Sequence, residues 1–201
     1  MRKVPVDKLV TAASNTTSPP FIPVQDNQTI FADYASRYKA GQFAQKPAIN
    51  SFCSNDGVAI LPFPADTNNV NTTAEAAALQ LAFLCPSEQS SSLRSAFNPH
   101  VYRYESAANF TNVSPQPWLG AYHSSDLAYI FGTHQEFRGH STGYEYETSH
   151  KFQDLLLAFI KDPENVEGWP TYSSGQLLRI GAQGGPVSQV VPNSEFSGPC
   201  Q

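Results

Sequence analysis

The stretch Pro117–Thr133, which reads PWLGAYHSSDLAYIFGT, decides how the rest of the chain is interpreted. Within it, His123 comes directly after a turn of small residues and directly before a second apolar segment. The run His100–Glu105 upstream alternates in the manner of a strand. A histidine on a loop beyond a buried strand is well placed to exchange protons with a bound substrate. The stretch therefore indicates an acid–base site, which a carboxylate and a nucleophile would complete.

The composition of the 201 residues is that of a globular chain, with 40% hydrophobic and 12% aromatic residues, enough for one sizeable core. The net charge of −5 argues against a nucleic-acid partner, which would require a concentrated basic surface. No apolar run approaches the roughly 18 residues that a bilayer crossing needs, so we expect no membrane span. The five histidines show no HExxH or comparable ligand spacing, so we expect neither a metal nor another cofactor.

Signals for export disagree with one another. The N-terminal sequence MRKVPVDKLV has two cations but no apolar core behind them, so we expect no signal peptide in this chain. A charged fraction of only 14% is nevertheless typical of an extracellular protein, and five Asn-x-Ser/Thr sequons offer possible N-glycosylation sites at Asn15, Asn27, Asn71, Asn109 and Asn112. Three cysteines allow one disulfide and leave one thiol.

The hydrophobic periodicity predicts both strands and helices, and the sequence shows no repeat and no firm internal domain boundary. We expect strands over 46–52 and 100–105, and a final strand over 176–180. A helix over 29–44 should stop near Gly41. A capping box from Thr72 to Glu75 should open a helix that Pro86 interrupts, with a separate helical stretch over 92–97. A second capping box, Thr142 to Glu145, should open a longer helix that ends at Asp162.

Asp56 and His123 each follow a predicted strand. In open α/β sheets, ligands bind at the edge where the carboxyl ends of the strands lie. A carboxylate there can hold the imidazole of the next loop in the tautomer that a general base needs. The alternative is that Asp56 is an ordinary turn residue of Asn55-Asp56-Gly57 and that His123 is an ordinary half-buried histidine. Spacing alone favours this alternative.

Eight segments, in the same order along the chain, resemble one family: FIPVQD, AGQFAQKPAI, SNDG, FLCPSEQ, VYRYE, PWLGAYHSSDLAYIFGT, FIKDP and WPTY. The chain resembles the type-B carboxylesterase/lipase family of α/β-hydrolases, the cholinesterase-like group, and within it the secreted fungal branch. The resemblance implies an incomplete α/β fold, the C-terminal part of an α/β-hydrolase fold with a few strands of the central sheet and flanking helices. It implies that residues 1–201 form a partial domain. It also implies a small-molecule or lipid ester as substrate, and an extracellular location for the complete family member.

The resemblance implies that His123 is the base of a catalytic triad and that Asp56 is its acid. Two residues depart from the family pattern, since aspartate replaces the commoner glutamate at position 56, and Ser124 stands where glycine usually follows the histidine. Asp126 matches a further acidic position of the family, and we interpret it as structural.

The resemblance also pairs Cys85 with Cys200 in a disulfide. Cys53 is then left as a buried thiol beside the acid turn. A catalytic role for Cys53 is disfavoured, because no cationic residue neighbours it in the sequence.

The expected nucleophile is missing, since no G-x-S-x-G elbow precedes Asp56, although in this family the serine comes first in the chain. The match that does exist, Gly139–Gly143, follows His123, and no apolar strand leads into it. We therefore disfavour Ser141 as a nucleophile. We expect a C-terminal fragment of a serine carboxylic ester hydrolase that is inactive alone. The alternative is a non-catalytic, cholinesterase-like binding module or pseudoenzyme, and the paired histidine and carboxylate favour the fragment.

Overall fold

The computed structural model describes residues 3–15, 23–64, 66–67 and 69–200, and it divides the chain into two units, residues 1–42 and residues 43–201. This division differs from the expectation of no internal boundary. The first unit contains α1 (Val6–Ser14) and α2 (Tyr34–Lys39). The helix expected over 29–44 is shorter because the carboxylate of Asp26 accepts three N–H groups of residues 28–30 and holds them in a turn. Gly41 follows α2 in a left-handed conformation, as expected of a helix stop.

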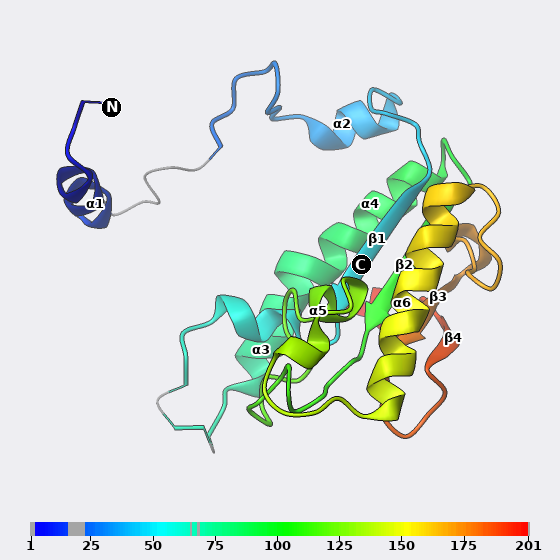
Figure 1. The fold of residues 1–201 in the computed structure, drawn as a ribbon. Helices are drawn as coiled ribbons and strands as arrows, with labels where there is room; N and C mark the ends of the chain where they lie inside the picture. The colour runs from blue at the N-terminus through cyan, green and yellow to red at the C-terminus, as the bar shows by residue number, and fades with distance from the viewer. Residues whose placement is uncertain (1–2, 16–22, 65, 68, 201) are drawn as a thin grey trace. The chain divides into compact units, whose positions relative to one another are not determined.

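The second unit is built on a sheet whose strands, within the described residues, lie in the order β1-β2-β3-β4 (Figure 1). They span Ala48–Cys53, Val101–Ser106, Gln176–Ile180 and Ser188–Pro192. The first three are parallel to one another, and β4 runs antiparallel to β3. The strand over 176–180 is therefore not the last one, and this expectation is wrong. β4 ends in Pro192, which cannot donate to a ladder and suits the edge of a sheet.

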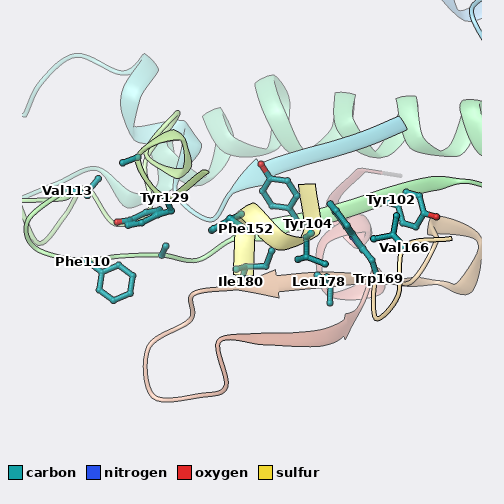
Figure 2. Packing of buried hydrophobic residues seen from close by; sticks show 13 residues of the cluster. Tyr102, Tyr104, Phe110, Val113, Tyr129, Phe152, Val166, Trp169, Leu178 and Ile180 are labelled. Atoms are coloured by element: carbon teal, nitrogen blue, oxygen red, sulfur yellow. The ribbon is translucent and has the colours of Figure 1, made fainter. Parts of the chain in front are cut away.

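Helices cover both faces of this sheet (Figure 1). On one face, α6 (Gly143–Lys161) packs with Phe152 and Leu155 against side chains of β2 and β3. Figure 2 shows Tyr104 of β2 beside Phe152 in this buried cluster. The expected capping box is present, because the Thr142 side chain accepts the N–H of Glu145 and the Glu145 carboxylate accepts the N–H of Thr142. All six residues of β2 are buried, which is typical of a parallel strand covered on both sides.

The opposite face is covered by one long helical run. It consists of α3 (Thr72–Leu79), a π-helical turn (Gln80–Leu84, the π-turn) and α4 (Cys85–Ser95). Pro86 does not interrupt it, contrary to expectation, because it lies in the first turn of α4. The N–H of Cys85 donates to the carbonyl of Gln80, five residues back, and the wider turn leaves room for the proline ring. The N-cap is Asn71, whose side chain accepts the N–H of Ala74, so the capping box expected at Thr72 is also wrong.

A disulfide joins Cys85 to Cys200, with the two Cα atoms 5.2 Å apart, so the pairing implied by the family resemblance is present. It ties the C-terminal segment to the start of α4. The remaining helices are short, and they span Asp126–Ile130 (α5), Ser194–Ser197 (α7) and four 3₁₀ turns, Asp56–Ile60, His134–Glu136, Tyr172–Ser174 and Gly198–Cys200. In the part of the chain that the structure describes, no helix has the length and apolar character that a bilayer crossing requires.

Candidate active site

Asp56 lies in a closed turn directly beyond β1. Only 2% of the residue is exposed, and its Oδ2 accepts the backbone N–H of Cys53 at 2.7 Å. Burial raises the pKa of Asp56, whereas the hydrogen bonds from Cys53 and His123 act in the opposite direction. A buried carboxylate is expensive unless it has partners, so this position is specialised rather than an ordinary surface turn.

His123 supplies the second partner of that carboxylate. Its Nδ1 lies 2.9 Å from Oδ1 of Asp56. The His123 side chain is 50% exposed, whereas that of Asp56 is enclosed. A carboxylate can only accept, so Nδ1 carries the proton and Nε2 is left as the basic nitrogen. The sequence placed these two residues on neighbouring loops, and the structure brings them into direct contact.

Asn55 connects the acid turn to the segment that leads to His123. Its side-chain amide donates to the carbonyls of Trp118 at 3.0 Å and Leu119 at 2.8 Å, and its backbone N–H donates to Ala121 at 2.9 Å. Gly120 has φ 58°, and a Cβ at that position would lie 3.1 Å from the Asn55 side chain. This role of Asn55 was not predicted from the sequence, since the only signal is its place in the Asn55-Asp56-Gly57 turn.

Ser124 and Asp126, which follow His123 in the chain, have clear positions. Ser124 adopts φ 68°, so the turn after His123 keeps the left-handed conformation that glycine would favour. Asp126 begins α5, and its Oδ2 accepts the hydroxyl of Tyr104 at 2.8 Å. This contact supports the structural interpretation of Asp126, because the oxygen at Nδ1 of His123 belongs to Asp56.

A cavity of about 170 Å³ adjoins the pair. It is lined by Ser51, Phe52, Cys53, Asp56, Phe83, His123, Ser124, Asp126 and Leu127. Ligand pockets usually hold about 300–1,000 Å³, so this cavity is smaller than a typical ligand pocket. Burial raises the pKa of the Cys53 thiol, and the charges of Asp126 and Asp56 raise it further. Cys53 is therefore an inert thiol, as expected.

Ser141 lies in a second cluster with His134 and Glu145. The Oγ of Ser141 is 2.7 Å from Nδ1 of His134, and Oε1 of Glu145 is 3.4 Å from the same nitrogen. A working triad has its acid and its nucleophile on opposite ring nitrogens, so this arrangement cannot act as a catalytic triad. Glu145 already serves the capping box of α6. The cluster is a structural support for the start of α6, which agrees with the rejection of Ser141 as a nucleophile.

The sequons differ in exposure. Asn15, Asn27, Asn71 and Asn109 are exposed. Asn112 is only 5% exposed, and its amide nitrogen donates to the carbonyl of His134 and to Oγ of Ser141. In the folded chain, the Asn112 amide is therefore enclosed, unlike the other four, and already hydrogen-bonded. Within the described ranges, no group of three or more His, Cys, Asp or Glu side chains is arranged to hold a metal ion.

Comparisons with known proteins find relatives over most of this chain. A relative from Aspergillus niger, a chlorogenic acid esterase, is 35% identical over 95% of this chain and 41% of its own length. A secreted lipase 5 from Gibberella zeae is also 35% identical, over 79% of this chain and 32% of its own length. The chain thus spans less than half the length of these curated relatives.

Solved structures share the fold at low identity. A PNB esterase superposes with a TM-score of 0.79 at 16% identity, covering 100% of this chain and 49% of that one. Aspergillus niger EstA superposes with a TM-score of 0.65 at 17% identity, covering 90% of this chain and 45% of that one. The model of the carboxylesterase family matches residues 64–196, which include both Cys85 and His123. The chain belongs to the carboxylesterase family, and its fold is part of an α/β-hydrolase.

Proposed function

We propose that this chain supplies the base and the acid of the catalytic triad of a serine carboxylic ester hydrolase. His123 is the base in this proposal, and Asp56 orients it. The observation that supports the proposal most strongly is the 2.9 Å contact between a buried carboxylate oxygen and Nδ1 of a half-exposed imidazole. A non-catalytic binding module has no need to bury a carboxylate beneath a histidine.

The geometry suits a two-step acyl transfer. The hydroxyl of a serine attacks the ester carbonyl carbon while Nε2 of His123 takes its proton. The imidazolium is stabilised by ionised Asp56, and it then returns the proton to the departing alkoxide. A water repeats the sequence on the acyl-serine, releasing the carboxylic acid and restoring the serine. No G-x-S-x-G precedes Asp56 within the 201 residues, so in this proposal the serine is on polypeptide outside them.

The substrate we propose is a carboxylic ester of a small molecule or a lipid. One relative is named an esterase of chlorogenic acid and the other a lipase, and an ester bond is what these substrates have in common. We also propose that the complete protein acts outside the cell. One relative is named as secreted, and disulfides such as Cys85–Cys200 persist in oxidising compartments.

The proposal can be tested in a fusion that carries the N-terminal portion of the Aspergillus niger relative ahead of this chain. Hydrolysis of a short-chain 4-nitrophenyl ester measures its activity. His123→Ala and Asp56→Asn should each lower kcat by about 10³-fold or more. The matched control is His150→Ala, which removes an exposed histidine of α6 and should leave kcat unchanged. An active fusion that keeps its rate after His123→Ala would disprove the proposal.

A further inference from the structure

The π-turn at Gln80–Leu84 brings an aromatic ring to His123. The ring centroids of Phe83 and His123 are 4.7 Å apart, and the ring planes are inclined by 41°. Short π-helical insertions within α-helices occur frequently at functional sites. Phe83 also lines the cavity beside His123.

We propose that Phe83 is a positioning residue for His123, holding the imidazole face so that Nε2 keeps one direction while Nδ1 stays on Asp56. This inference rests on the proposed role of His123 as a general base. Phe83 acts through His123 and not on the substrate, so it is not itself a catalytic residue.

The position of Phe83 depends on the widened turn. A single additional residue in a helical turn changes the register of the flanking segments by about 100°. The π-turn ends at Leu84, two residues before Pro86, whose ring would collide with the carbonyl four residues back in a regular α-helix. The turn that accommodates the proline is therefore the turn that presents Phe83 to the site.

His123 needs such a contact. It lies on a loop, half of its side chain is exposed, and the hydrogen bond to Asp56 fixes only one of its ring atoms. The imidazole can therefore pivot about the Nδ1–Oδ1 line unless something lies against its face.

Ordinary core packing does not account for Phe83. It is only half-buried, and it belongs to neither buried cluster found among the described residues, whereas its neighbour Leu84 is a member of one. Leu84 anchors the π-turn to the sheet. Phe83 is left to face the imidazole.

The test uses the 201-residue chain and the NMR resonance of the His123 Nδ1 proton. We would measure how fast this proton exchanges with solvent, since exchange requires the pair to open. The loss of an aromatic contact of this kind should change the equilibrium between the closed and open Asp56–His123 pair by about two- to ten-fold. Phe83→Leu keeps apolar bulk but removes the flat ring, so it should speed exchange by about that factor. Phe83→Tyr should restore the slow rate. The matched control is Phe97→Leu, which removes a ring just beyond α4 that contacts Phe43 and should change nothing.

Asp56→Asn separates this inference from the function on which it rests. The Nδ1 proton resonance should be lost in this variant. Unchanged exchange in Phe83→Leu, together with loss of the resonance in Asp56→Asn, would overturn the positioning role and leave the Asp56–His123 pair intact. A resonance that survives Asp56→Asn would overturn both. Equal acceleration in Phe83→Leu and Phe97→Leu would show a general loss of stability and would also overturn the positioning role.

Discussion

Replacing Gly57 by alanine should displace the acid of the pair. A Cβ added at Gly57 would lie 2.2 Å from the carbonyl oxygen of Glu75 and 2.5 Å from the amide nitrogen of Leu79. Both are backbone atoms of α3, so neither can rotate away. Ordinary contacts of a Cβ begin at 3.4 Å, and the acid turn must therefore separate from α3 by about 1.2 Å, the difference between 3.4 and 2.2 Å.

This displacement should lower both the unfolding free energy of the chain and the kcat of the fusion enzyme. Overpacking usually costs about 1–3 kcal/mol, and two backbone collisions place Gly57→Ala at the upper end, about 3 kcal/mol of unfolding free energy. A shift of about 1 Å in Asp56 would also lengthen the 2.9 Å contact with His123 beyond hydrogen-bonding range. In the fusion enzyme, a misplacement of that size should lower kcat by about 10²-fold.

Chemical denaturation of the 201-residue chain measures the loss of stability. The His123 Nδ1 proton resonance reports whether the contact with Asp56 is kept. Gly143→Ala is the matched control, because a Cβ there meets nothing within 4 Å and its φ is not positive. Gly143 lies in a helix, so its replacement should stabilise the chain by about 0.4–1 kcal/mol. If Gly57→Ala unfolds at the same denaturant concentration as Gly143→Ala and keeps the resonance, the close approach of α3 does not position Asp56.

Three further predictions concern the same unit. Ser124→Gly should raise the unfolding free energy by about 0.5–1 kcal/mol in urea unfolding, because it removes the strain of a serine held in the left-handed conformation at φ 68°. A loss of stability would contradict this. Burial raises the folded-state pKa of Asp56 above its unfolded value, so the stability that this group contributes is present in acid and is lost as the pH rises through the folded pKa. Asp56→Asn cannot titrate, so its stability relative to the native chain should rise as the pH increases from about 4 through the folded pKa of Asp56, and a fall would refute the assignment. Replacing Cys85 and Cys200 by serine should lower the unfolding free energy by about 2–5 kcal/mol, since the bridge closes a loop with a sequence separation of 115; a smaller loss in non-reducing denaturation would count against that estimate.

The parts of the fold that the sequence predicts well are those fixed by local chemistry. The Thr142–Glu145 capping box specifies the start of α6 because both partners lie within one helical turn. The contact between Asp56 and His123 joins residues 67 positions apart, and spacing alone did not support it. That contact became predictable only through the resemblance of the PWLGAYHSSDLAYIFGT stretch to a known family.

Features that depend on tertiary context were not predicted from the sequence. β4 is short and ends in proline, so its pairing with β3 leaves little trace in hydrophobic periodicity. Pro86 predicts a helix break by local rules, yet the helical run continues through it because the preceding π-turn leaves room for the proline ring. Asn55 makes its contacts with residues more than 60 positions away, so nothing near it in the sequence reveals them.

Several departures from the usual preferences of residues and helices lie around one residue, His123. A buried carboxylate, a serine with positive φ and a π-turn all lie next to His123. Each of these features is unfavourable by itself, and such features usually persist where a function depends on them. The cluster of Ser141, His134 and Glu145 also contains a buried carboxylate, but Glu145 belongs to the capping box of α6, and none of these three residues has a positive φ. This contrast distinguishes the two histidine clusters more clearly than residue composition does, and it supports the catalytic role that we propose for His123 over a surface used for binding alone.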